Sequence, residues 1–410
     1  MTLDPVRIEV HTPGGLSARE RELVVRAGLK GRAPVEAWEV VGTNRQLAYS
    51  THGVFRFFGK FPPPIARHLI DSFTEPGDWV LDPMTGSGTT AVEALARRRN
   101  AVVRDVSPLS TLLCRVKTRH VSKKDSTRAL DRVSKRLGSI DDASLPTPVD
   151  LRHPDHWFLP ETRRSLGRIR AAIDTEPDTA NRELLLTAFV STVRRVSKAT
   201  TQQGRLFLDV GTAQADAWPT FVDRFQRYAE AVASLPLRRP ARLLIEQHDA
   251  KASPPRLHPR FPLSIIHPPY FNNYKYSSIN SLELAWLGVS RQAIRATEVR
   301  EAFKVGRPER VGEYVDDLVT AVACVSNELA HGGVLALMMG DTIIRDGYID
   351  VTRRLLDEVE RRVERLALDR VVVRVPRYTE ASWVASQRRT GDRVGITLHD
   401  FILIFSKRDR

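Results

Sequence analysis

The chain has 410 residues, of which 42% are hydrophobic, so it is long enough for a large buried core or for more than one domain. Lys and Arg number 63 against 49 Asp and Glu, and the formal net charge of +14 indicates a polyanionic partner, most simply nucleic acid. Two cysteines exclude a disulfide framework and a cysteine zinc site, and we predict no metal. With neither a signal peptide nor an apolar run of membrane-spanning length, we expect a cytoplasmic protein with no membrane partner.

The N-terminal region is predicted to be a leader, residues 1–53, ahead of the main domain. It contains a short strand pattern at 6–10 and a basic helical pattern at 18–28. The proline run at 62–64 then predicts a turn that enters a helix at 65–73, because proline is tolerated in a first helical turn.

A strand, a glycine-rich turn, a helix and a second strand follow. The strand covers 79–81, the turn is Thr85-Gly86-Ser87-Gly88, the helix has apolar residues at helical spacing over 89–99, and the second strand covers 101–106. Such a unit predicts a parallel sheet. The turn can bring backbone N–H groups close to a ligand, although glycines that only relieve steric strain explain this turn equally well by themselves.

A segment rich in arginine and helix-forming residues, 119–239, predicts a helical insertion. The strand pattern then returns, and the whole chain predicts an α/β fold with a doubly wound, mostly parallel sheet. The later elements are strands within 242–250 and 261–274, a helix at 311–330, a strand at 334–341, a helix at 348–366, and strands at 370–375 and 400–407.

Acidic residues end three of the predicted strands. Ligands of doubly wound sheets bind at the carboxyl ends of strands, where an acidic residue can accept hydrogen bonds from ribose hydroxyls. We therefore expect Asp105 to meet a ribose, Asp249 an adenine edge, and Asp82 an ammonium group.

The stretch at 265–288 runs from a hydrophobic strand into His267, Pro268, Pro269 and Tyr270. Two prolines fix φ and remove two N–H donors, so backbone carbonyls and an aromatic ring are presented at a strand tip. A rigid exposed turn is the alternative, but it does not explain the apolar strand and the glycine turn in a basic protein.

These stretches together resemble the motifs of the amino-group DNA methyltransferases, which act on N4 of cytosine or N6 of adenine. "LDPMTGSGTT" at 81–90 resembles the cofactor motif, "HPPYFNNYKYSSINSLELAWLG" at 267–288 the catalytic region, and "FGKFPPPIARHLI" at 58–70 the segment that covers the cofactor. The resemblance extends over about 54–407 and implies the class I methyltransferase (Rossmann-like) fold.

The same resemblance implies S-adenosylmethionine as the cofactor, double-stranded DNA as the partner, and a cognate restriction or defence-system protein. It assigns 54–118 and 240–410 to the catalytic domain and makes 119–239 the expected DNA-recognition region. The implied cofactor-binding residues are Lys60, Phe61, Asp82, Met84, Gly86, Gly88, Thr89, Asp105 and Asp249. The implied catalytic residues are His267, Pro268, Pro269 and Tyr270, with Tyr270 stacked on a base turned out of the duplex.

Two residues depart from the family pattern. Met84 replaces the usual Phe and is expected to pack on the cofactor all the same. His267 stands where Ser accompanies N4-cytosine and Asp or Asn accompanies N6-adenine methylation. Neutral imidazole offers one acceptor for the target amine and protonated imidazole offers none, so activity is expected to fall with pH near the ordinary His pKa of about 6.5.

We therefore predict a DNA methyltransferase acting on N4 of cytosine. Three alternatives stay open: methylation of N6 of adenine, methylation of guanosine N2 in RNA, and a catalytically degenerate subunit that binds nucleic acid.

Overall fold

The computed structural model of the chain describes residues 7–11, 15–41, 46–202, 205–209, 211, 215–237, 241–255, 258–271, 274–300, 310–344, 347–374, 395–396 and 400–408. Four residues of the elements and motifs predicted above lie outside these ranges: residue 6, residues 272–273 and residue 375.

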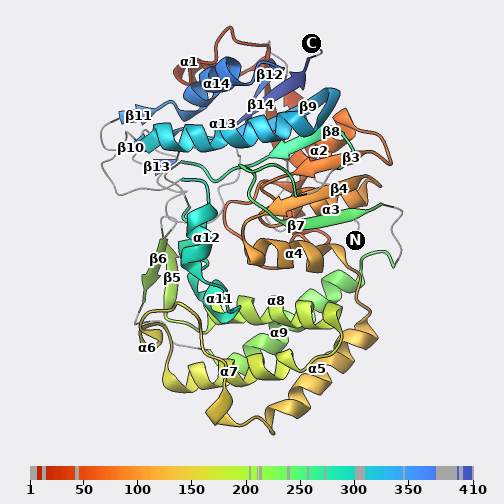
Figure 1. Cartoon of the computed structure of the whole chain (residues 1–410), viewed down its shortest axis with the longest axis vertical. Coiled ribbons are helices and arrows are strands. Elements are labelled where there is room, and N and C mark those ends of the chain that lie inside the picture. The colour runs from red at the N-terminus through yellow and green to blue at the C-terminus, as the bar shows by residue number, and fades with distance from the viewer. Residues whose placement is uncertain are drawn as a thin grey trace.

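A nine-stranded sheet crosses the upper part of the molecule in the order β1-β2-β12-β14-β9-β8-β3-β4-β7 (Figure 1). Its strands are β1 (Arg7–His11), β2 (Val35–Val41), β3 (Trp79–Asp82), β4 (Asn100–Asp105), β7 (Leu243–Gln247), β8 (Phe261–Ile266), β9 (Leu329–Met339), β12 (Leu366–Arg374) and β14 (Asp400–Lys407). The run β9-β8-β3-β4-β7 is parallel, whereas β14 is antiparallel to both β9 and β12. The sheet confirms the doubly wound, mostly parallel fold class.

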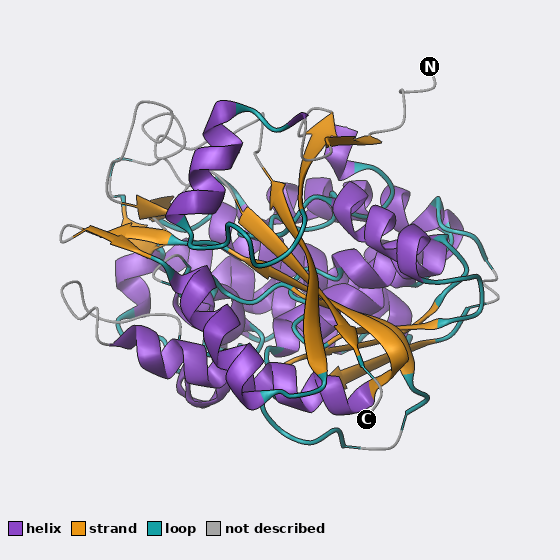
Figure 2. Ribbon diagram, turned by 90° about the horizontal axis from the view of Figure 1, so that it is seen from above, coloured by secondary structure: helices purple, strands orange, loops and turns teal. Residues whose placement is uncertain are grey.

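Helices cover both faces of this sheet (Figure 2). One face packs against α1 (Ala18–Arg26), α13 (Val311–Glu328) and α14 (Val351–Arg362), and the other against α2 (Pro63–Phe73), α3 (Thr89–Ala96) and α4 (Pro108–Thr118). Successive strand residues alternate between the two cores: Leu335 and Leu337 of β9 join the first, and Ala336 and Met338 join the second. The long apolar runs in these strands therefore reflect a sheet buried on both sides.

The N-terminal region is part of the sheet and is not a separate leader. Strand β1 pairs antiparallel with β2, and β2 pairs parallel with β12. Trp38 of β2 is 2% exposed and packs in the second core. The pairing covers the edge of β12 that would otherwise be free, which is the physical reason for the difference from the sequence prediction.

The lower part of Figure 1 is a layer of helices from the predicted insertion. It holds α5 (Lys123–Leu137), α6 (Pro154–Trp157), α7 (Pro160–Asp174), α8 (Thr179–Arg195) and α9 (Ala217–Ala233), with a hairpin of β5 (Ala199–Gln202) and β6 (Arg205–Leu208). Its core also takes in Leu113 of α4 and Trp286, which follows the catalytic motif. The helical layer and the sheet domain therefore share buried residues.

Three short helices join the two parts: α10 (Tyr276–Ile279), α11 (Ser281–Trp286) and α12 (Arg291–Thr297). A small sheet contains β10 (Thr342–Ile344), β11 (Gly347–Ile349) and β13 (Gly395–Ile396), and two 3-10 turns lie at Gln46–Ala48 and Asp142–Ser144. The predicted helix at 348–366 is wrong at both ends, because Tyr348 pairs in β11 and α14 stops at Arg362. Among the helices of the described ranges, none is long and apolar enough to cross a membrane.

Candidate functional site

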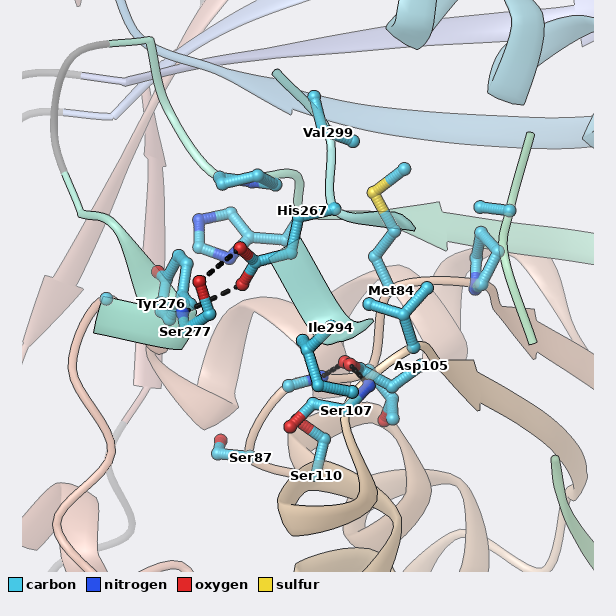
Figure 3. Close-up of a pocket in the computed structure, with 18 of the residues that line it drawn as sticks. Met84, Ser87, Asp105, Ser107, Ser110, His267, Tyr276, Ser277, Ile294 and Val299 are labelled. Carbon is cyan, nitrogen blue, oxygen red and sulfur yellow. Dashed lines mark hydrogen bonds between the residues drawn. The ribbon is translucent and has the colours of Figure 1, made fainter. Parts of the chain in front are cut away.

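A pocket of about 960 Å³, partly open to solvent, lies at the carboxyl ends of the parallel strands (Figure 3). This volume is within the range of small-molecule sites, and the position is where doubly wound sheets bind ligands. Of the predicted residues, the pocket brings together Lys60, Phe61, Met84, Gly86, Thr89, Asp105, Asp249, His267 and Pro269. The others, Asp82, Gly88, Pro268 and Tyr270, are not part of its lining.

The glycine turn between β3 and α3 forms one wall. Gly86 has a φ of 49° and Gly88 a φ of 81°, both in the left-handed region that favours glycine. A Cβ on Gly88 would lie 3.0 Å from Sγ of Cys114, so this glycine permits close packing of the turn on α4. Gly86 instead faces the pocket, where a Cβ would lie 3.3 Å from the ring of Phe57.

Asp105, at the end of β4, holds this turn in place. Its Oδ2 accepts a hydrogen bond from the Gly86 N–H, and its Oδ1 accepts one from the Ser107 N–H, both at 2.9 Å. Burial raises the pKa of the carboxyl. One carboxylate thus joins the glycine turn to the loop after β4, and it also lines the pocket.

Two buried ionisable groups lie beneath the turn. Asp82 is 2% exposed, and its Oδ1 accepts a hydrogen bond from the Met84 N–H at 3.1 Å. Burial raises its pKa to about 7, and the charge of Asp105 raises it further. Lys117 of α4 is 1% exposed and donates from Nζ to the Ser87 carbonyl at 2.8 Å, and burial lowers its pKa to about 7.

Asp249 lies in the loop after β7 and lines the pocket. Its Oδ1 accepts a hydrogen bond from the Lys251 N–H at 2.9 Å and lies 3.1 Å from Lys251 Nζ. The same Nζ donates to the Thr297 carbonyl at 2.7 Å, which joins this loop to the end of α12.

His267 follows β8 and is partly buried between two aromatic rings. The centroids of Phe61 and Tyr270 each lie 5.2 Å from that of the imidazole, and the Tyr270 ring is nearly perpendicular to it, at 74°. Burial lowers the His267 pKa to about 3, and the positive charge of Arg374 lowers it further. The imidazole is therefore neutral at neutral pH, and the prediction that it titrates near pH 6.5 is wrong.

Tyr270 lies behind His267 and is 9% exposed. Its ring packs flat on Gly340, where a Cβ would lie 2.8 Å from Cδ2, and its Oη has no hydrogen-bond partner among the described residues. Pro269 lines the pocket, and its carbonyl accepts a hydrogen bond from Tyr314 Oη at 2.8 Å. Tyr270 therefore supports His267 from behind and does not offer a stacking face to the pocket.

The opposite wall comes from α10 to α12, and the sequence analysis missed it. Tyr276 stacks on Phe57 with centroids 5.7 Å apart and planes 19° apart. Glu298, directly after α12, accepts hydrogen bonds from both polar groups of Ser277 (Figure 3). The residues of this wall are Tyr276, Ser277, Asn280, Leu284, Ile294, Thr297, Glu298 and Val299.

Only part of this wall had a signal in the sequence. Tyr276, Ser277, Asn280 and Leu284 fall inside the stretch that resembles a catalytic region, whereas α12 matches no motif. Ser107 and Ser110 also line the pocket, and their signal was their position just after the acidic end of β4. Within the described part of the chain, no group of three or more His, Cys, Asp or Glu side chains is placed to hold a metal ion.

Comparisons with known proteins match this arrangement. A family model described as DNA methylase matches residues 16–108, which include β3, the glycine turn and β4. The type II methyltransferase M.BsoBI of Geobacillus stearothermophilus is 26% identical over 285 residues, which are 62% of this chain and 55% of that protein. M.MvaI of Kocuria varians, also a type II methyltransferase, is 24% identical over 230 residues, 50% of each chain.

A third type II methyltransferase, M.MjaII of Methanocaldococcus jannaschii, is 27% identical over 133 residues, which are 31% of this chain and 25% of that protein. The chain therefore spans between 25% and 55% of the length of these three relatives. Among solved structures, TrmN from Thermus thermophilus has a TM-score of 0.32 and 13% sequence identity, covering 85% of this chain and 50% of that one.

Proposed function

We propose that this chain, a member of the amino-group DNA methyltransferase family, transfers a methyl group from S-adenosylmethionine to an exocyclic amine of a base in double-stranded DNA. The observation that carries the proposal is that one continuous pocket reaches from Gly86 and Asp105 to His267. A donor bound at the glycine turn and an amine bound at the imidazole would then share one enclosed space.

The residues of the pocket fit S-adenosylmethionine, the cofactor that the family match supports. Gly86 presents backbone without a side chain, Asp105 and Asp249 offer carboxylate acceptors to a nucleoside, and Phe61 offers an aromatic surface. We propose that these residues hold the cofactor, with Met84 and Thr89 beside it and Lys60 at the rim. When bound, its sulfonium supplies the electrophilic methyl group.

His267 is proposed to accept a hydrogen bond from the target amine. An exocyclic amine is a poor nucleophile because its lone pair is delocalised into the ring, and an acceptor for its N–H helps to localise that pair. The low pKa of His267 keeps one imidazole nitrogen available as the acceptor. Pro268, next in the chain, is proposed to offer its carbonyl to the second N–H of the amine.

The base itself needs an aromatic surface once it leaves the duplex. Because Tyr270 is packed on Gly340, we propose that the pocket-lining rings of Phe57, Phe61 and Tyr276 supply that surface.

The target is proposed to be N4 of cytosine, with N6 of adenine as the alternative, since a histidine acceptor suits either amine. The helical layer is proposed to contact DNA, because the chain is strongly basic and this layer packs on the segment that follows the catalytic motif. The relatives are type II methyltransferases, so we further propose a role in restriction–modification with a cognate endonuclease.

The test has three steps on the full chain. Calorimetry with S-adenosylmethionine measures cofactor binding, transfer of a labelled methyl group to duplex DNA and to RNA identifies the substrate, and base-resolved mapping of DNA from expressing cells identifies the base. We expect binding, transfer to DNA, and N4-methylcytosine. Transfer to RNA alone would overturn the DNA assignment, and binding without any transfer would indicate a degenerate subunit.

A further inference from the structure

Glu298 places a second carboxylate on the pocket, on the wall opposite the glycine turn. It follows α12 directly, in a segment that matches none of the motifs. Its side chain is 11% exposed, and the pocket is the space that its carboxylate shares with Asp105.

Ser277 fixes the direction of this carboxylate. The Ser277 N–H donates to Oε1 at 2.8 Å, and the Ser277 hydroxyl donates to Oε2 at 2.6 Å. Both bonds stabilise the ionised form. The nearest basic side chain given for it, Arg295, is 3.8 Å away and 41% exposed, so solvent screens that ion pair.

Contacts on both sides hold the end of α12 against the pocket. Before Glu298, the Thr297 carbonyl accepts the hydrogen bond from Lys251. After it, Arg300 donates to both carboxylate oxygens of Asp317, at 2.8 and 3.0 Å. Glu298 is therefore held by a defined backbone as well as by Ser277.

The charge balance of the pocket favours a cation. Two carboxylates, Asp105 and Glu298, face one partly enclosed space, and burial raises the pKa of both. Asp105 also acts on Glu298 as a like charge. A ligand that brings positive charge into this space offsets both the burial and the repulsion.

We propose that Glu298 is a specificity-determining residue that makes the pocket prefer the sulfonium form of the cofactor over its neutral thioether product. The inference rests on the proposed function, because it assumes that S-adenosylmethionine occupies this pocket. S-adenosylmethionine and S-adenosylhomocysteine differ by one methyl group and one positive charge at sulfur, so their affinity ratio reports on a nearby carboxylate. Such a preference helps product to leave and donor to enter.

The experiment is calorimetry of the full chain with each of the two ligands at pH 8. In Glu298→Gln, which keeps the size of the side chain and an acceptor for Ser277, we expect the preference for S-adenosylmethionine to fall about tenfold. The affinity for S-adenosylhomocysteine should stay nearly the same. Ser277→Ala should lower the preference by a smaller factor, since the carboxylate is then less well oriented.

Glu183→Gln is the matched control. Glu183 is also a mostly buried glutamate, 13% exposed and paired with arginines, but it lies on α8 and does not line the pocket. Its substitution should leave the ratio unchanged. Thermal melting of each variant checks folding, and Ser277→Ala carries the test if Glu298→Gln does not fold.

An equal loss of affinity for both ligands in Glu298→Gln, or no loss at all, would overturn the inference, since the carboxylate would then not sense the sulfonium charge. Failure of the wild-type chain to bind either ligand would instead overturn the proposed function.

Discussion

The two walls of the pocket are built in different ways. The wall at the glycine turn is held by contacts of the backbone close in sequence: Asp105 accepts from Gly86 and Ser107, and Asp82 accepts from Met84. The wall at α10 to α12 is held by side chains from distant parts of the chain. Arg194 of α8 donates to both oxygens of Glu283 in α11, at 2.9 to 3.0 Å, and also to the Ile279 carbonyl.

This difference separates binding from stability. Substitutions at the glycine turn should change what the pocket binds while the fold persists. Substitutions that release α10 to α12 should weaken the packing between the helical layer and the sheet domain, because Trp286 of α11 lies in the core of that layer.

The largest effect is expected from Arg194→Ala. Glu283 is 3% exposed at its side chain, and removing its partner leaves a buried carboxylate unpaired. We expect the free energy of unfolding to fall by about 3–5 kcal/mol in urea denaturation. Arg227→Ala is the control, since the exposed pair of Arg227 with Asp223 should contribute less than about 1 kcal/mol. Equal losses in the two variants would remove the distinction between the walls.

Gly86→Val should weaken S-adenosylmethionine binding about a hundredfold, roughly 2.7 kcal/mol, in a chain that stays folded. The added carbons enter the pocket beside Phe57, at a φ that β-branched residues avoid. Gly77→Val is matched for backbone strain, with a φ of 98° and nothing within 4 Å of its Cβ. It should bind the cofactor normally in calorimetry, and normal binding by the Gly86 variant would contradict the proposed cofactor site.

His267→Ala should slow single-turnover methyl transfer about ten- to hundredfold, because the target amine loses its acceptor. His267→Asn keeps an acceptor and should retain most of the rate. Because the His267 pKa lies near 3, the acid limb of the rate against pH should be the same in the wild type and in His267→Asn. A limb present only in the wild type would show that the imidazole titrates in the assay range.

Asp82→Asn should change the pH dependence of stability by roughly 1–3 kcal/mol. The native pKa of about 7 is above the ordinary Asp value of 3.8, so between these values the native state binds more protons and wild-type stability falls as pH rises. Asparagine keeps an acceptor for the Met84 N–H and does not ionise. The variant should therefore be more stable than the wild type at pH 8, and an unchanged slope in urea titrations at pH 5 and pH 8 would contradict the shift.

The smallest effect is expected on the helical layer, outside both walls. Arg163 and Arg164 form exposed ion pairs with Asp155 and Asp142, at 2.7 and 3.6 Å, and such pairs exchange readily for phosphates. Charge reversal of both should flatten the plot of log affinity for DNA against log salt by at most about 1.8, or 0.9 per phosphate lost.

The control for that experiment is charge reversal of Arg361 and Arg362 on α14, on the far side of the sheet domain. An equal change in slope for both pairs would mean that the salt effect reflects overall charge and not contact with the helical layer.

The first wall could be predicted from the sequence because its parts are contiguous. A strand, a glycine turn and a helix form from residues close in the chain, and the strand-end carboxylates Asp82 and Asp105 are placed by the parallel order of β3 and β4. The fold class followed from the same local patterns, since alternating strands and helices have few ways to pack.

Several features depended on the tertiary structure alone. The strands β1 and β2 add to the sheet only because β12 leaves an edge beside them, and Tyr270 turns away from the pocket because Gly340 offers a flat surface behind it. Lys117 reaches the glycine turn from α4, and Glu298 reaches the pocket from α12. Hydrophobic periodicity sets which face of an element is buried, but it does not say which distant side chain meets it. The burial that moves the pKa of His267 from its ordinary value to about 3 therefore appears only when the chain is folded.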